Sequence, residues 1–567
     1  MKTESTGSMP DIGDFLDVPA KSKGLYWPLL ALATVLLITV ASLIWNYEHP
    51  FGFNWDESVY LDEMQTDVGQ FHAHGVSGAI KAWLVGDPLR PPAYRVFAFP
   101  FALLFGPSPF VLRFVATLFR AFTLALVYLG ICRVGGRAAA ALSVILLDLC
   151  PDFIFFGTVF YNEYVLYLAV AGMCCFVFRS WNQCVGSVFN CLGLGVFLGI
   201  GALAKASFPV LAGCFLGIIA FLSLCKRIAG PSPQFLLNAS VVGALIAVPW
   251  WLLNFRSGLG YVRYAVNFSR GSMGPVGIGS ALRYLLRFLQ EGLGLPIACL
   301  CITLLIVASI RYFRARQLQV PGASSWAVIS LLLAPLPTLL APLATHNQVM
   351  YHTSQALILL AAGFALLAEN EGWLSSPIAL VIVTIVIVAQ LALTLTPVIL
   401  RQQYPGQRFA WTTLGRWEQW DWNQFRVLLR SQGLKQPTIG YIGLIGPLNP
   451  PQIQYPWISH NEMPPPVTLL WRQEDGTPEM TALVAAAGTN EVVFTVPDLA
   501  TGATQEDLAD NLYNTGFAER MQNNRDFGTP LHLRMGRFHP ADVWIFIQKD
   551  SQDKQVLHTT TGPQLRR

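Results

Sequence analysis

The stretch that decides the fold is residues 27–57, which read WPLLALATVLLITVASLIWNYEHPFGFNWDE. Its first part, residues 27–45, is uncharged and mostly apolar, and with its flanks it can cross a bilayer, which takes about 20 residues. The adjacent acids Asp56 and Glu57 follow about ten residues later. Carboxylates at a membrane surface lose hydration unless they face an aqueous cleft. The pair therefore predicts chemistry at the membrane boundary.

Composition places the whole chain in a membrane. Hydrophobic residues make up 53% of the 567 positions and charged residues 12%, whereas a soluble domain carries roughly 25% charged residues. The net charge of +4 and the lack of a basic tract argue against a nucleic-acid partner. Residues 1–24 are polar and are expected to form a cytoplasmic tail before an uncleaved signal-anchor. The ten cysteines lie only between Cys132 and Cys301, so the polar C-terminal region needs no disulfides.

About eleven apolar runs are long enough to span the membrane. They are residues 26–46, 109–131, 137–157, 163–180, 187–204, 207–225, 235–254, 294–312, 325–344, 351–369 and 374–398. Lys and Arg gather in those short loops that share a side with the N-terminus, which predicts that this side is cytoplasmic. Residues 25–399 would then form a transmembrane domain, with large outer loops at 47–108 and 255–293. Residues 400–567 would lie outside the cytoplasm.

The first outer loop is expected to contain helices that lie on the membrane. Residues 94–105 are apolar but too short to span. Residues 57–71 have helical spacing, with one acidic face and one apolar face. The acidic face, expected to be wet, holds Asp56, Glu63 and Asp67, and the apolar face, expected to meet lipid, holds Val59, Leu61, Met64, Val68 and Phe71.

The C-terminal region, residues 400–567, has the sequence pattern of a small α/β domain. Strands are predicted at 438–445, 467–471, 491–496 and 543–548, and helices at 417–432 and 504–516. Proline-rich turns separate them. We find no phosphate-binding glycine loop, metal cluster or nucleophile elbow in this region.

Asp56 and Glu57 have two interpretations. They can be an acidic pair in the first turn of a helix, where the helix dipole favours negative charge. Alternatively, one of them is a general base that takes a proton from an attacking hydroxyl. By the predicted topology, the other polar candidates lie on the same side of the membrane, which favours chemistry.

Three cations lie on this outer side, against the usual preference for positive loops inside. Arg90 precedes Pro91-Pro92, Lys205 ends a glycine-rich span, and Arg256 follows a Pro-Trp-Trp stretch. The side chain of each can lie along apolar surface with its charge at the membrane–water interface, or it can hold a lipid phosphate. Glu163, also at an outer boundary, is either an interfacial acid or part of a site.

In this order, these residues resemble the glycosyltransferases of the C-type (GT-C) fold, among them the bacterial lipid A aminoarabinose transferases and the protein O-mannosyltransferases. The resemblance covers roughly residues 25–400. It is carried by a set of short motifs, each weak alone. They are Trp55-Asp56-Glu57, Arg90-Pro91-Pro92, Arg113 in a span, Gly157-Thr158 through Glu163, Ala204-Lys205, Pro249-Trp250 through Arg256, and Tyr351 at the start of a span. Arg90 stands where the family usually has Lys, and Glu163 where it usually has Asp.

The resemblance implies a polyprenyl-phosphate sugar donor, a glycan, lipid or protein acceptor, and an inverting transfer at the outer face of a bacterial inner membrane. Asp56, with Glu57 beside it, would act as general base. The donor phosphate would bind Arg90, Lys205, Arg256 and Tyr351, and Glu163 would bind the acceptor or sugar. No metal or cofactor is expected, because the cations supply the positive charge.

Three other functions compete with this prediction. A transporter or flippase for a lipid-linked saccharide should carry its polar residues near the bilayer midplane, whereas the candidates here lie at the ends of spans. A non-catalytic membrane protein that binds carbohydrate would tolerate loss of Asp56. A polysaccharide polymerase or ligase with a lipid-diphosphate donor would need more cations than the sequence offers.

Overall fold

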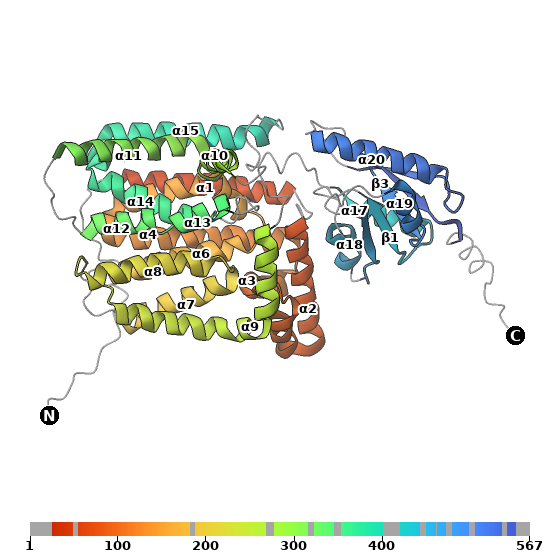
Figure 1. Cartoon of the computed structure of the whole chain (residues 1–567), viewed down its shortest axis with the longest axis horizontal. Helices are drawn as coiled ribbons and strands as arrows, with labels where there is room; N and C mark the ends of the chain where they lie inside the picture. Colours follow the sequence, from red (N-terminus) through yellow and green to blue (C-terminus); the bar gives the residue numbers. More distant parts are fainter. Residues whose placement is uncertain are drawn as a thin grey trace, which may run out of the picture.

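The computed structural model describes residues 25–48, 55–181, 187–228, 230–267, 277–315, 323–344, 353–400, 420–442, 450–460, 462–471, 479–497, 505–535 and 541–550. In these residues a bundle of apolar helices carries a smaller α/β unit at one end (Figure 1).

The helices of the bundle follow the chain from α1 to α15. They are α1 (Tyr26–Glu48), α2 (Trp55–Lys81), η2 (Ala82–Gly86), α3 (Ala93–Phe105), α4 (Pro109–Asp148), α5 (Pro151–Phe156), α6 (Glu163–Arg179), α7 (Val188–Ala204), α8 (Phe208–Leu224), α9 (Pro233–Asn267), α10 (Ile278–Arg287), η4 (Phe288–Gly294), α11 (Leu295–Ala315), α12 (Ala323–Leu333), α13 (Leu336–Leu340), η5 (Ala341–Ala344), α14 (Ala356–Asn370), η7 (Trp373–Ser375) and α15 (Pro377–Leu400).

This is a multi-pass membrane protein. Among the described residues, six helical segments are long and apolar enough to cross a membrane, and further apolar helices are shorter. Helices occupy all the predicted apolar runs. Two of these runs are broken, between α4 and α5 and between α12 and α13. Pro151 and Pro335 stand at the breaks, and proline removes a helical hydrogen bond and clashes with the preceding turn.

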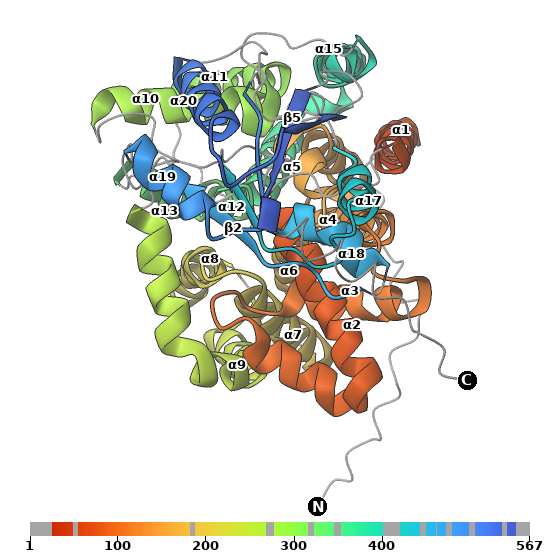
Figure 2. The same cartoon turned by 90° about the vertical axis from the view of Figure 1, so that its right-hand side faces the viewer.

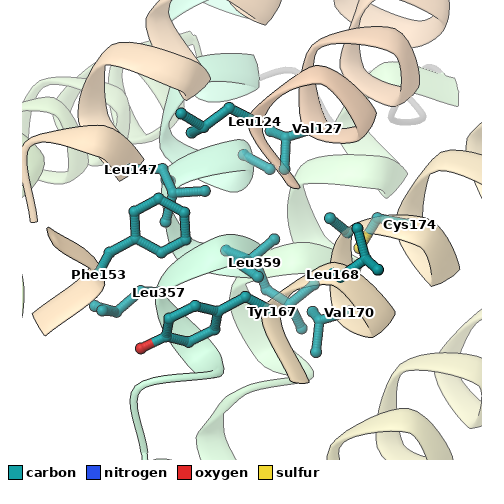
Figure 3. Close-up of a cluster of buried hydrophobic side chains, with 14 of the residues drawn as sticks. Leu124, Val127, Leu147, Phe153, Tyr167, Leu168, Val170, Cys174, Leu357 and Leu359 are labelled. Atoms are coloured by element: carbon teal, nitrogen blue, oxygen red, sulfur yellow. The ribbon is translucent and has the colours of Figure 1, made fainter. Parts of the chain in front are cut away.

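The core of the bundle forms around α4, which packs against α1, α6 and α14. Figure 3 shows this core, where Leu124 and Val127 of α4 lie near side chains of α6 and α14. Lipid tails are as apolar as leucine side chains, so the hydrophobic effect does not drive such helices together. Close van der Waals packing holds them instead. Small residues allow the closest approach. At Gly130 a Cβ atom would lie 2.9 Å from the Cα atom of Cys175 on α6.

Gly130→Ala should therefore destabilise the bundle by about 1–3 kcal/mol, because the added methyl group forces α4 and α6 apart. Gly213→Ala on α8 is the matched control, since its methyl group would meet nothing within 4 Å. Alanine is favoured over glycine in a helix interior by about 1 kcal/mol, so the control should be neutral or stabilised. Thermal unfolding in detergent measures both variants. Equal midpoints would contradict this account of the α4–α6 contact.

Helices α2 and α3 differ from the sequence prediction. Leu61 and Met64 of α2 are buried in the core instead of facing lipid. The face expected to be wet packs against α3, where Arg95 pairs through two nitrogens with the buried Asp67. The prediction of a wet face was wrong for Glu63 and Asp67, because α3 supplies Tyr94 and Arg95 as their partners and the sequence alone did not place α3 there. Asp56, on the same face, lines a cavity instead.

The C-terminal unit is a five-stranded sheet with helices packed on it. Its elements are α17 (Trp422–Ser431), β1 (Ile439–Ile442), α18 (Pro450–Ser459), β2 (Val467–Trp471), α19 (Met480–Ala487), β3 (Val492–Thr495), α20 (Gln505–Gln522), β4 (Leu531–Met535) and β5 (Ala541–Ile547). The strand order is β2-β1-β3-β5-β4, with β2, β1 and β3 parallel and β5 antiparallel to both β3 and β4. The predicted strands form part of this sheet. β4, α18 and α19 were not predicted.

The sheet unit rests on the bundle through α18, which packs against α2. Figure 2 views the molecule from the end that carries this unit, with the sheet in front of the helices. Tyr455 of α18 faces toward Arg113 of α4, and burial raises the pKa of Tyr455 to about 12 although the Arg113 charge opposes the shift. The C-terminal unit is thus in contact with the helix that begins at Trp55-Asp56.

Candidate functional site

A cavity of about 330 Å³ lies at the end of the bundle. It is bordered by the start of α2, the segment before α3, the start of α6, the junction of α7 and α8, the outer part of α9, and α13 with η5. The lining residues include four predicted site residues, Asp56, Arg90, Glu163 and Lys205. Residues far apart in the chain thus meet in one place.

Each charged residue is placed by a helix end or a turn. Asp56 lies in the first turn of α2 and Glu163 begins α6, where the helix dipole favours a carboxylate. Lys205 follows α7 in an extended conformation, so its side chain leaves the helix and enters the cavity. Arg90 follows a turn in which the side chain of Asp87 accepts hydrogen bonds from the backbone nitrogens of Leu89 and Arg90.

Lys205 and Glu163 form an ion pair inside the cavity wall. Their Nζ and Oε1 atoms lie 2.5 Å apart, and the side chain of Glu163 is 1% exposed. The other carboxylate oxygen, Oε2, is buried and has no hydrogen-bond partner in the described part of the chain. An unpaired buried acceptor is costly, so this oxygen is available to a ligand that carries a hydroxyl group.

Asp56 faces the positive side chains of Arg90 and Lys205. Burial raises the pKa of Asp56 above its ordinary value, and the two cations oppose that shift. A carboxylate with a raised pKa is a stronger base than an exposed aspartate. The Asp56 carboxylate can therefore accept a proton from a group in the cavity.

The Arg90 guanidinium lies near two aromatic rings at the cavity edge. Its central carbon is 5.4 Å from the ring centre of Tyr60 and 5.8 Å from that of Tyr261. Its Nη1 atom lies 3.4 Å from Glu63 and 3.5 Å from Asp87, both long for a charge-assisted hydrogen bond, while its buried Nε has no hydrogen-bond partner among the described residues. The guanidinium can therefore still bind an anion.

Glu57 does not share the place of Asp56. Its carboxylate is fully buried and pairs with Arg113, with Nε to Oε1 at 2.8 Å and Nη2 to Oε2 at 2.6 Å. It also accepts a hydrogen bond from the backbone nitrogen of Phe160, at 2.9 Å. Glu57 is absent from the cavity lining, so its contacts tie α2 to α4 and to the turn before α6.

Two predicted residues remain, Arg256 and Tyr351. Arg256 is exposed on α9 and does not line the cavity. Trp251, Gly258 and Val262 of the same helix do line it. Tyr351 lies outside the described residues.

Several lining residues were missed by the sequence reasoning. Tyr60 and Tyr261 enclose Arg90, and Asn162, Ser207 and Trp251 complete the polar wall. Tyr60 follows Asp56 by one helical turn, a spacing that places the two on one face of a helix and offered a usable signal. Tyr261 carried no such signal, because it reaches Arg90 only if α9 continues past the end of the apolar run at residue 254.

Positive charge at the cavity comes from Arg90 and Lys205. Among the described residues, no group of three or more His, Cys, Asp or Glu side chains is arranged to hold a metal ion.

Comparison with known proteins identifies the fold. Residues 89–252 match the family model of the dolichyl-phosphate-mannose-protein mannosyltransferases. The structure is similar to that of ArnT from Cupriavidus metallidurans bound to undecaprenyl phosphate, with TM-score 0.52 and 14% identity over 92% of this chain and 98% of that one. Its apo state gives 0.54 and 13% over the same shares.

The chain has the GT-C glycosyltransferase fold. Another similar structure is the oligosaccharyltransferase AglB from Archaeoglobus fulgidus in complex with an inhibitory peptide and a dolichol-phosphate, with TM-score 0.50, 12% identity, and 90% of this chain and 74% of that one covered. No curated protein sequence matches the chain. The GT-C fold predicted from the sequence is confirmed, and the similarity to ArnT extends beyond residues 25–400, since it covers 92% of the chain.

Proposed function

We propose that this protein is a glycosyltransferase that moves a sugar from a polyprenyl-phosphate donor to an acceptor hydroxyl at the outer face of a bacterial inner membrane. The observation that carries the proposal is the cavity at the bundle end, where the Asp56 carboxylate faces Arg90 and Lys205. A base opposite two cations suits a reaction in which a hydroxyl loses a proton while a phosphate gains negative charge.

The reaction needs three parts, and the cavity offers a group for each. Asp56 takes the proton of the acceptor hydroxyl, whose oxygen attacks the anomeric carbon from the face opposite the phosphate. The bond between that carbon and the phosphate oxygen breaks, and the phosphate leaves with the electron pair. The configuration is thereby inverted. Arg90 and Lys205 stabilise the negative charge that develops on the phosphate.

Glu163 positions Lys205 and offers an acceptor for a substrate hydroxyl. Its Oε1 atom holds Lys205 in place and its Oε2 atom lacks a partner among the described residues. A hydroxyl of the sugar or of the acceptor would satisfy Oε2. Such a buried acceptor discriminates strongly against substrates without the hydroxyl.

The proteins of similar fold support the class of donor. The ArnT structure contains undecaprenyl phosphate, and the AglB structure contains a dolichol-phosphate together with an inhibitory peptide. The matched family model describes enzymes that use dolichyl-phosphate mannose. All three names contain a polyprenyl phosphate, and the name of the family model adds a sugar carried on it. They do not agree on one acceptor, so the acceptor here is proposed only as a glycan, lipid or protein hydroxyl.

The proposal is tested with the purified full-length protein and radiolabelled polyprenyl-phosphate sugars. We expect release or transfer of sugar from at least one donor of a panel, and none from the matched nucleotide sugars. If no lipid-phosphate donor is consumed by folded protein, the proposal is wrong and a transporter or a binding protein becomes the better explanation.

Arg90→Gln should lower kcat/KM for the donor about a hundredfold, on the scale of removing one preorganised hydrogen-bond donor from a transition state. Arg256→Gln is the matched control, because Arg256 is exposed on α9 and absent from the cavity lining. The control should lose far less. Equal losses in the two variants would show that the cavity is not where the phosphate binds.

A further inference from the structure

Glu63 is not among the lining residues of the cavity, but it contacts Arg90, which is. It follows Asp56 by two helical turns on α2. Its Oε1 atom is 3.4 Å from Nη1 of Arg90, and its Oε2 atom accepts a hydrogen bond from the hydroxyl of Tyr94. Arg95 lies farther away, with its Nη1 atom 3.9 Å from Oε2.

This corner of the protein holds more acids than bases. Its charged and titratable groups are Asp56, Tyr60, Glu63 and Asp67 on α2, Asp87 and Arg90 in the segment before α3, Tyr94 and Arg95 on α3, and Tyr261 on α9. Arg95 is already bound by Asp67 through two nitrogens. The carboxylates nearest to Arg90 are therefore those of Glu63 and Asp87, and Asp56 also acts on its charge from within the cavity.

We propose that Glu63 is a positioning residue that competes with the lipid phosphate for Arg90, so that anion binding weakens as the pH becomes alkaline. This inference rests on the proposed function, in which Arg90 holds the phosphate. When Glu63 is neutral, the positive charge of Arg90 is free for the ligand. When Glu63 is ionised, it draws the guanidinium to itself.

The protonation of Glu63 changes within an accessible pH range. Burial, and next the neighbouring Asp87 carboxylate, raise the pKa of Glu63 to about 8, against the opposing charges of Arg95 and Arg90. Below that pH Glu63 is mostly protonated and can donate a hydrogen bond to Asp87, which favours this form. Above it, Glu63 is mostly a carboxylate. A bound phosphate would favour the protonated form, because binding and protonation at coupled sites are reciprocal.

The size of the effect follows from the fraction of protein in the competent form. With a pKa of about 8, about one-tenth of Glu63 is protonated at pH 9, so the apparent Kd should rise about tenfold from its value at pH 7. The ligand's own titration cannot cause this loss. A phosphate monoester has its second pKa at about 6, so its charge is nearly complete at pH 7 and becomes no less negative at pH 9.

The test is binding of radiolabelled undecaprenyl phosphate to the detergent-purified full-length protein at pH 7 and pH 9. The wild type should bind about tenfold more weakly at pH 9, and Glu63→Gln should bind equally at both values. Glu371→Gln is the matched control, because Glu371 forms an exposed pair with Arg311 in another part of the bundle. This control should keep the wild-type pH dependence.

A second variant covers the case in which Glu63→Gln does not fold. Tyr94→Phe removes a hydrogen bond that stabilises the carboxylate form of Glu63. It should therefore move the loss of binding to a higher pH. An unchanged midpoint would count against the inference.

The outcomes separate the inference from the proposed function. If wild-type binding does not depend on pH, or if Glu63→Gln keeps the dependence while Asp56→Asn loses it, Glu63 is not the competitor. If the lipid phosphate binds at neither pH, the inference and the proposed phosphate site both fail. If binding has the expected pH dependence but no sugar is transferred, the inference stands and the proposed enzyme activity is wrong.

Discussion

Replacing Asp56 by Asn should lower the rate of sugar transfer about a thousandfold, within the range expected for loss of a general base. The amide has almost the same size and can still form hydrogen bonds, but it cannot take the proton of the acceptor hydroxyl. The loss should appear in the rate constant of the transfer step, measured in a single turnover with a radiolabelled polyprenyl-phosphate sugar at a saturating concentration. A variant with more than a tenth of the wild-type rate would show that Asp56 is not the base.

The pH dependence supplies a second readout of the same residue. Asp56 must be ionised to act, so activity should fall as the pH is lowered through its pKa. Because burial raises that pKa despite Arg90 and Lys205, the fall should begin at a higher pH than for an exposed aspartate. The residual activity of Asp56→Asn should lack this acidic limb, while binding of undecaprenyl phosphate should persist, which separates proton transfer from binding.

Replacing Arg113 by Met should destabilise the protein by about 3–5 kcal/mol, the usual result of leaving one partner of a buried ion pair alone. Arg113 and Glu57 are both fully buried, and the Arg113 guanidinium also lies 4.9 Å from the ring centre of Trp45. Without Arg113, the Glu57 carboxylate has lost its counter-charge at a fully buried position. Thermal unfolding in detergent measures the change.

The double variant Glu57→Gln with Arg113→Met is the matched control. The glutamine keeps a carbonyl oxygen for the backbone nitrogen of Phe160, which donates to Glu57 at 2.9 Å in the native protein. With both partners of the ion pair replaced by neutral side chains, much of the lost stability should return. If Arg113→Met alone unfolds at the wild-type temperature, the ion pair does not hold α2 to α4.

The transmembrane helices were predictable because each depends mainly on its own stretch of sequence. A run of apolar residues forms a helix in lipid whatever its neighbours do, since the backbone has no other partner there. The breaks in two predicted runs also have a local cause, because Pro151 and Pro335 stand at them. The unpredicted strand β4 lies at the edge of the sheet, where half-buried leucines alternate with exposed polar residues before the buried Met535, so its sequence shows no continuous apolar run.

The site was predictable only in part, because side-chain direction depends on packing. Lys205 and Arg256 both follow apolar spans, yet only Lys205 lines the cavity. Trp251 lines it from α9, and Arg256 comes five residues later, about 140° around the helix. That rotation can be calculated from the sequence, but which face of α9 meets the cavity cannot. Glu57 and Asp56 differ in the same way, since adjacent residues on a helix point in different directions.

The pairing of Glu57 with Arg113 also bears on how the protein is made. The two residues are 56 positions apart in the chain. Translation adds about 5–20 residues per second, so Glu57 is synthesised roughly 3–11 seconds before its partner. During that interval α2 has no counter-charge to fix it, and its acids must remain hydrated. Asp56 therefore reaches its place in the cavity only after the second long span has been inserted, and a nascent chain that stops before α4 would carry the Asp-Glu pair without a formed cavity.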